Sequence, residues 1–208
     1  MAQVTADGLT VGYAAMLEQF HPTEAVDLSA HAEAHGFSGV MAADHYQPWV
    51  PAQGQAAFVW NVLTALGERT TGDIGPGVTA PTFRWHPAVV AQASATLAAM
   101  YPGRHWLGLG SGEALNEHIV ANYWPEAPER INRMFEAIEI IKKLFSSSIA
   151  GKDVKHAGQF YKLYLHPKFL AHQLLSVRSL EDLDYAARGV NAIWGHVRDF
   201  QEIRRGVS

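Results

Sequence analysis

The sequence predicts a single α/β domain built on a parallel β-sheet. Within residues 9–145, four short apolar segments that are typical of strands alternate with four longer segments that are typical of helices. Polar clusters follow the second and the fourth predicted strand. Parallel folds bind ligands at the carboxyl ends of their strands, whether the sheet is doubly wound or closed as a barrel, so we expect both clusters at one functional edge.

The first unit pairs a short strand with a capped helix. The segment Leu9–Ala14 is apolar and β-prone, and it leads to a helix over Glu24–His35. We expect Thr23 to be the N-cap of this helix and Gly36 to end it, because glycine tolerates the backbone conformation that often follows a helix.

The second unit carries the first polar cluster. The apolar segment Phe37–Ala42 favours a buried strand, and Asp44 and His45 follow it directly. A long loop over residues 46–55, rich in proline and glycine, then leads to a predicted helix over Ala56–Arg69.

The third and fourth units complete the alternation. A glycine-rich strand over Ile74–Ala80 precedes a helix that Pro87 opens, at the helix position where proline is favoured, and that ends at Met100. The fourth strand covers His105–Gly110, and the amphipathic run Glu129–Phe145 forms the helix after it.

The pattern weakens in the C-terminal part of the chain. Phe160–Leu165 is compatible with one more strand, and Ser179–Arg188 is helical in character without a clear strand partner. Residues 164–208 therefore stay unassigned, and we expect residues 1–208 to form one domain, as the length favours.

Composition and charge exclude several classes of function. The formal net charge is -4 without a run of like charges, which gives no basis for binding nucleic acid or an anionic membrane. The absence of cysteine excludes disulfides, thiolate metal sites and a cysteine nucleophile. With no predicted signal peptide and no long apolar segment, we expect a cytoplasmic protein that acts on a small-molecule substrate.

Two clusters carry titratable groups suited to proton transfer. Asp44 and His45 place a carboxylate beside an imidazole that exchanges a proton near neutral pH, although a hydrogen-bonded loop pair explains them equally simply. Glu113 follows the fourth strand, where a carboxyl group close to a cofactor can be kept protonated as an acid. Alternatively, Glu113 caps a turn over residues 114–118.

The second cluster begins with a glycine-rich run over residues 108–112. Such a run lets a phosphate or a flat ring approach the main chain, but it matches neither the dinucleotide fingerprint nor the Walker pattern, and a purely structural turn is an open alternative. His31 and His35 lie four apart on a helix with no evident third ligand, so we predict no metal site.

Longer motifs point to a known family. In chain order they are Gly12-Tyr13 with Glu18-Gln19-Phe20, Asp44 to Trp49, Thr79 to Gln92, and Leu107 to His118. Together they resemble the coenzyme F420-dependent glucose-6-phosphate dehydrogenase group of luciferase-like oxidoreductases, over roughly residues 9–163. The resemblance implies a TIM (β/α)8-type barrel, a deazaflavin at its C-terminal face, hydride transfer with the substrate, and a homodimer.

The resemblance also implies roles for individual residues. His45 corresponds to the base that takes the hydroxyl proton, Trp49 to an aromatic side chain lining the substrate, and Asp44 to a residue contacting the cofactor. Glu113 corresponds to the acid that supplies a proton to the reduced deazaflavin.

Further positions correspond to the walls of the cofactor site. Gly77 and Val78 align with a bulge under the cofactor ring, where relatives carry a non-proline cis peptide. Gly110, Ser111 and Gly112 form the loop that borders the cofactor.

The chain departs from this family in its second half. A complete barrel takes about 250 residues, so we expect a barrel that is shortened or incomplete in its C-terminal half. Residues 164–208 offer no counterpart of the relatives' phosphate-binding lysines and arginine, which leaves glucose 6-phosphate unsupported as substrate. An open half-barrel exposes apolar surface, which favours dimerisation, poor solubility or incomplete folding.

The sequence therefore leaves three functional hypotheses. The first is an F420-dependent oxidoreductase acting on a small alcohol or carbonyl compound. The second is a monooxygenase that shares the barrel but binds flavin mononucleotide, FMN. The third is a non-catalytic remnant that binds a cofactor without completing a substrate site.

Overall fold

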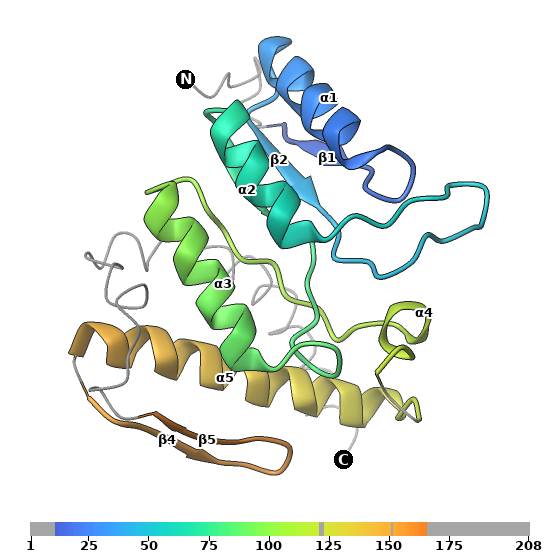
Figure 1. Cartoon of the computed structure of the whole chain (residues 1–208). Coiled ribbons are helices and arrows are strands. Elements are labelled where there is room, and N and C mark those ends of the chain that lie inside the picture. The colour runs from blue at the N-terminus through green and yellow to red at the C-terminus, as the bar shows by residue number, and fades with distance from the viewer. Residues whose placement is uncertain (1–10, 121–122, 151, 166–208) are drawn as a thin grey trace, which may run out of the picture.

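The first half of the chain forms a parallel three-stranded sheet. It is seen in a computed structural model that describes residues 11–120, 123–150 and 152–165 (Figure 1). The strands lie in the order β1 (Tyr13–Ala15), β2 (Gly39–Ala42) and β3 (Asp73–Pro76). The register pairs Tyr13 with Val40, and Val40 with Ile74. The parallel pairing confirms the α/β class predicted for the first half of the chain.

Helices follow the strands in alternation. They are α1 (Pro22–Ala34), α2 (Val59–Arg69), α3 (Pro87–Met100), the short α4 (Ala114–Glu117) and α5 (Ala127–Ala150). In Figure 1, α1 and α2 lie beside the sheet, and α5 crosses the end of α3. Within the described residues, none of the helices is both long enough and apolar enough to cross a membrane.

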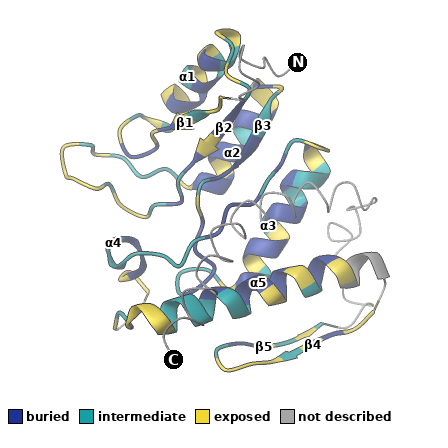
Figure 2. Cartoon of the chain, turned by 180° about the vertical axis from the view of Figure 1, so that it is seen from behind, coloured by how far each residue is buried: buried dark blue, intermediate teal, exposed yellow. Residues whose placement is uncertain are grey.

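The core covers one face of the sheet and continues between α3 and α5. Its most buried large side chains, each at most 2% exposed, are Leu63, Leu66, Ile74, Leu107, Ile140 and Ile141. Figure 2 shows the buried sides of α2, α3 and α5 turned toward this layer. On β2, Val40 is 3% exposed whereas Met41, on the opposite face, is 40% exposed. Burial is thus concentrated on one face of the sheet.

The start of α1 differs from the prediction. Pro22 occupies the first turn, and the N-cap is His21, whose ring accepts a hydrogen bond from the backbone N–H of Thr23 at 3.4 Å. Thr23 is therefore not the cap, because proline favours the first helical position and the cap is the residue directly before Pro22. At the other end, Gly36 follows the helix with a φ of 101°, as its predicted role requires.

The predicted fourth strand is only partly paired. His105 bridges Ile74 and Leu109 bridges Thr79, both in parallel, but no continuous ladder forms between these isolated bridges. Gly77 and Val78 lie between the bridged residues Ile74 and Thr79. Gly77 N–H donates to the backbone C=O of Ala42 at 2.8 Å, and the backbone C=O of Val78 accepts from Asp44 N–H at 3.2 Å. This stretch therefore bonds to the strand on its other side.

The C-terminal part of the described chain adds a hairpin. Strand β5 (Lys162–Leu165) confirms the strand predicted near this position, but it pairs antiparallel with β4 (Val154–Ala157), which was not predicted. The hairpin forms a separate two-stranded sheet. It extends beside α5 in Figure 1.

Within the described ranges, the parallel sheet is open and does not close into a barrel. The helical character predicted for Ser179–Arg188, with all of residues 166–208, lies outside the residues that the structure describes. The described part therefore corresponds to consecutive β/α units along one side of a parallel fold.

Candidate active site

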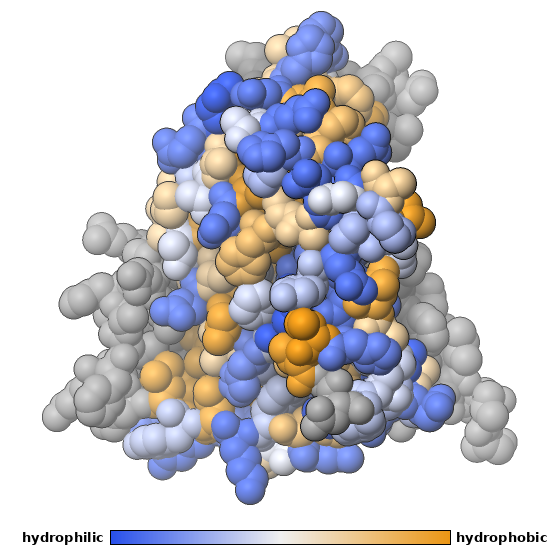
Figure 3. All heavy atoms as spheres, turned by 45° about the vertical axis from the view of Figure 1, so that its right-hand side comes forward, coloured by the Kyte–Doolittle hydropathy of each residue, from blue (hydrophilic) through white to orange (hydrophobic). Residues whose placement is uncertain are grey.

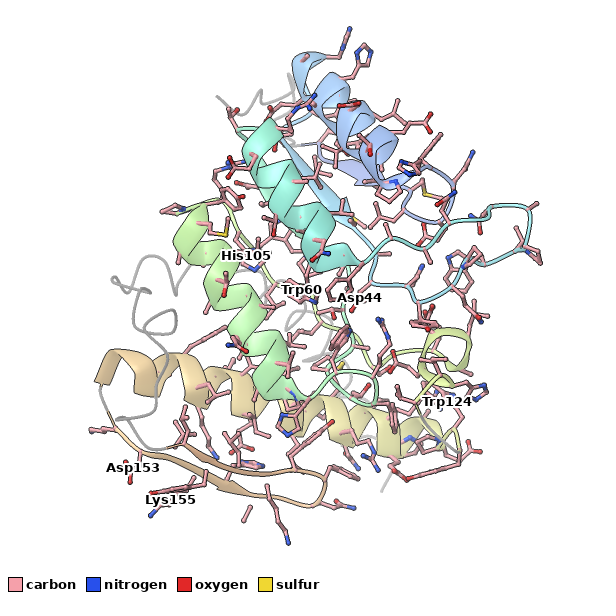
Figure 4. The ribbon with its side chains drawn as sticks, viewed as in Figure 1. Asp44, Trp60, His105, Trp124, Asp153 and Lys155 are labelled. Carbon is pink, nitrogen blue, oxygen red and sulfur yellow. The ribbon has the colours of Figure 1, made fainter. Side chains whose placement is uncertain are left out.

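The candidate site lies where three loops leave the parallel segments. The first follows β2 and carries Asp44, which lies beyond the end of that strand in Figure 4. The second runs from β3 to α3 and includes Arg84, and the third connects the fourth parallel segment to α4 and carries Glu113. Both predicted polar clusters therefore meet at one edge of the sheet.

His45 is the centre of the titratable groups. Its Nδ1 is hydrogen-bonded to the carboxylate of Glu18, and its Nε2 lies 3.5 Å from Glu113 Oε1. The ring of Trp49 meets the His45 ring edge to face, with 5.0 Å between centroids and 88° between planes. The structure thus brings together all three residues predicted as catalytic.

The surroundings of His45 favour its protonated form. Burial of the ring acts to lower the pKa of His45, but the hydrogen bond and charge of Glu18, with the charges of Glu113 and Asp44, outweigh it and raise the pKa above 6.5. The side chain is 15% exposed, so these charges act through a partly desolvated space.

Glu18 is a site residue for which the sequence predicted no role. It follows β1 closely and is 2% exposed. Burial acts to raise the pKa of Glu18, but the hydrogen bond to His45, a backbone hydrogen bond and the charge of His45 lower it overall. A carboxylate just beyond a predicted strand was the available signal, because strand ends in this fold converge on the site.

Glu113 begins α4 without using its side chain as a cap. Its backbone C=O accepts from the N–H groups of Asn116 and Glu117, whereas its side chain makes no capping hydrogen bond. The carboxylate, 42% exposed, instead faces His45 and accepts from the side-chain amide of Asn116 at 2.5 Å. The turn after Glu113 therefore leaves the carboxylate available for chemistry.

Asn116 connects the first loop, which carries His45, to the third loop, which carries Glu113. It is 1% exposed, and its Oδ1 accepts from Tyr46 N–H at 2.6 Å and from Gln47 N–H at 3.1 Å. Its Nδ2 donates to Glu113. One buried amide thus binds both the loop after His45 and the carboxylate that faces His45.

Asp44 points into the protein. Its carboxylate accepts hydrogen bonds from Thr79 Oγ1 at 2.6 Å and Trp85 Nε1 at 2.8 Å on one oxygen, and from Arg84 at 3.1 Å on the other. Its side chain is 1% exposed. These bonds make Asp44 an anchor of the first loop.

The glycine positions form a close-packed wall beside the site. The peptide between Gly77 and Val78 is cis, as the resemblance implied. A Cβ on Gly110 would lie 2.7 Å from Val78 Cγ2, and Gly112 has a φ of 78°. Ser111 is partly buried, and its backbone C=O accepts a hydrogen bond from Thr82 Oγ1 at 3.4 Å. Only glycine at position 110 allows the loop after the fourth parallel segment to approach Val78 this closely.

The surface near the first and third loops mixes polar and apolar side chains. The side of the molecule that carries the long loop and α4 displays apolar islands among hydrophilic side chains (Figure 3). Exposed apolar residues of these segments include Trp49, Val50, Ile119 and Val120.

Comparison with known proteins identifies the family. Residues 3–176 match the model of the luciferase-like monooxygenases, and the chain belongs to this family. It is 47% identical over 159 residues to an F420-dependent glucose-6-phosphate dehydrogenase of Mycobacterium avium (strain 104), covering 74% of this chain and 46% of that protein. It is 49% identical over 156 residues to the protein of that name from Microbacterium testaceum (strain StLB037), covering 74% and 45%.

A solved structure supports the same relationship. An F420-dependent secondary alcohol dehydrogenase, in complex with an F420-acetone adduct, matches with a TM-score of 0.71 and 37% identity over 74% of this chain and 46% of that one. The chain spans about half the length of the relatives it matches. The residues that match the family model, 3–176, include the candidate site described above.

Proposed function

We propose that this chain carries the cofactor and proton-transfer site of an F420-dependent oxidoreductase, which moves a hydride between a small alcohol or carbonyl substrate and the coenzyme. The observation that carries the proposal is the placement of His45 between Glu18 and Glu113. Relatives with F420-dependent dehydrogenase activity in their names support the same class.

His45 would act as the base in alcohol oxidation. With its Nδ1–H donated to Glu18, neutral His45 has a free lone pair on Nε2, the nitrogen that faces Glu113. Nε2 takes the hydroxyl proton as the C–O bond becomes a carbonyl and the hydride leaves carbon. Glu18 stabilises the imidazolium that results, as an orienting carboxylate does in other acid–base sites.

Glu113 would supply the second proton. A deazaflavin held at this site would supply the hydride acceptor, and its full reduction would need one proton in addition to the hydride. In this reaction a protonated Glu113 would deliver that proton from beside His45, and Asn116 orients the Glu113 side chain. Oxidation of one alcohol thus delivers a proton to His45, takes one from Glu113 and transfers one hydride.

The residues beside the site fit a flat ring. Val78 and Met41 are 45% and 40% exposed, and Gly77 and Gly110 add no side chains between them. A flat apolar wall of this kind suits the face of a deazaflavin. We propose Gly77, Val78 and the loop of Gly110, Ser111 and Gly112 as its binding surface.

Asp44 and Trp49 would act around that surface. We propose that Asp44 supports the cofactor wall through Thr79 and Trp85, to which its carboxylate is bonded. Trp49, 55% exposed and in contact with the His45 ring, would line the substrate side. An exposed indole next to the base offers an apolar surface to a small substrate.

We also propose that residues 1–208 form one domain of the TIM-barrel type that is incomplete in its C-terminal half, and that two copies associate. The exposed apolar side chains Ile119, Val120 and Tyr123, between 53% and 57% exposed, favour contact with a second copy.

The deciding experiment is a parallel titration of the purified chain with oxidised coenzyme F420 and with FMN, followed by fluorescence quenching. We expect F420 to bind at least about tenfold more tightly, a difference of about 1.4 kcal/mol. Preference for FMN would favour the monooxygenase hypothesis, and binding of neither would favour the non-catalytic remnant.

A further inference from the structure

The three loops of the site share one buried cation, Arg84. Its side chain is 8% exposed and donates to Asp44 twice, to Oδ1 at 3.1 Å and to the backbone C=O at 2.6 Å. Its backbone N–H donates to Glu117 Oε2 at 2.8 Å, and its Nε lies 3.7 Å from Glu117 Oε1. Arg84 therefore bonds both to the first loop and to α4, the helix that follows the third loop.

The three charges are buried together. The side chains of Asp44 and Glu117 are each 1% exposed. Burial raises the pKa of Glu117, and the hydrogen bond and charge of Arg84 act against that rise. Buried carboxylates are tolerated only when they are paired and hydrogen-bonded, so separating the loops would leave charge without a partner.

Each partner of Arg84 adjoins a proposed catalytic residue. Asp44 immediately precedes His45 in the chain. Glu117 packs on Gly112, since a Cβ at Gly112 would lie 3.0 Å from Glu117 Cγ, and Gly112 immediately precedes Glu113. Arg84 is thus linked to each catalytic residue through one buried carboxylate and a direct neighbour of that residue in the chain or in space.

We propose that Arg84 is a positioning residue that, through Asp44 and Glu117, holds Glu113 beside His45. This role rests on the proposed function, because it matters for catalysis only if His45 and Glu113 exchange protons. Asn116, which is also buried, bonds the first loop through Tyr46 N–H and the third loop through the Glu113 side chain. Arg84 acts instead through the charged carboxylates of Asp44 and Glu117.

The charge of Glu113 provides a measure of this placement. The carboxylates that act on His45 are Glu18, Asp44 and Glu113, of which only Glu113 comes from the third loop. Neutralising Glu113 therefore lowers the pKa of His45 only while the third loop is held in place.

The test is a double-mutant cycle read by NMR titration of the His45 ring, without coenzyme. The four chains are the parent, Glu113→Gln, Arg84→Met and the double variant. We expect Glu113→Gln to lower the His45 pKa in the parent and to leave it unchanged when Arg84 is replaced. A fall of equal size in both backgrounds would overturn the proposal.

A matched control separates positioning from general stabilisation. Arg104 is also partly buried and donates to Gly72, Gly67 and Thr70 near the opposite ends of the strands. Arg104→Met should destabilise the chain yet keep the full effect of Glu113→Gln on His45. Loss of the effect in this control as well would contradict a specific role for Arg84.

A conservative variant keeps the test decisive if Arg84→Met does not fold. Arg84→Lys retains the buried positive charge, but a single ammonium cannot reproduce the two-pronged contact with Asp44. We expect a reduced effect of Glu113→Gln in this background, and an undiminished effect would overturn the proposal. F420 titration of the same samples tests the proposed function separately, because the His45 measurement needs no coenzyme.

Discussion

At the scale of single residues, the charge state of His45 depends on Glu18. The hydrogen bond and charge of Glu18 help to raise the His45 pKa, and a base must be neutral to act. We predict that Glu18→Gln lowers this pKa and moves the rise of kcat/KM with pH to lower pH. A pH–rate profile for alcohol oxidation measures the shift; an unmoved profile would contradict the assignment.

His45 itself is the second residue-scale test. We predict that His45→Ala reduces kcat by about 10²–10⁴-fold, the usual contribution of a positioned base. F420 binding should change little, since the proposed binding wall lies at Gly77, Val78 and Gly110. The control is His35→Ala at the exposed C-cap of α1, where turnover should be unaltered. Equal turnover in the two variants would sink the proposed role.

The sequence predicted the members of the site better than their connections. His45, Glu113 and Trp49 follow from strand ends and motifs, and the structure brings them together. Glu18 and Arg84 were assigned no role, because a carboxylate or guanidinium far away in the chain reveals its partner only after the loops fold. Hydrogen bonding across 27 or 40 positions leaves no local periodicity to detect.

At the scale of elements, the third loop depends on one glycine. Gly112 combines a φ of 78° with a Cβ position only 3.0 Å from Glu117 Cγ. We predict that Gly112→Ala lowers the free energy of unfolding by about 2 kcal/mol, from backbone strain and overpacking together. Gly103, with a φ of 74° and nothing near its Cβ position, is the control. Urea unfolding should find Gly103→Ala less costly; equal losses would show that the contact is unimportant.

The β4–β5 hairpin is anchored by a buried hydroxyl. Tyr161 donates to the C=O groups of Pro81 and Thr82, at 3.1 and 2.8 Å, in the loop that leads to Arg84. We predict that Tyr161→Phe costs about 1–2 kcal/mol because a buried hydrogen bond is lost. Tyr164→Phe, at a side chain 61% exposed, should change the free energy of unfolding little. Thermal and urea unfolding compare the two, and similar small effects would argue against the anchor.

Elements with strong local signals were predicted most closely. The helix opened by Pro87 runs to Met100 as expected, since proline and helical pattern agree there. β4 was missed because a strand of four residues is too short for an alternation of apolar and polar side chains to be recognised in the sequence. The pairing of His105–Gly110 is limited to isolated bridges at Ile74 and Thr79, a long-range feature that sequence does not encode locally.

At the scale of the whole molecule, association is the property to measure. If two copies meet through Ile119, Val120 and Tyr123, unfolding is coupled to dissociation. We predict that Tm rises with protein concentration over a hundredfold range, and that Val120→Glu removes this dependence. A Tm independent of concentration in the parent chain would refute association.

The shared contacts of Arg84 carry a consequence for engineering. Asp44 and Arg84 come from two loops and Glu117 from α4, which follows the third loop, yet the two carboxylates share one guanidinium. None of these segments can therefore be exchanged alone for that of a relative with a different residue at its contact. A graft that alters substrate choice through the first or third loop would have to import matching sequences at the other two. We therefore expect these three segments to vary together among relatives, and they should be redesigned together.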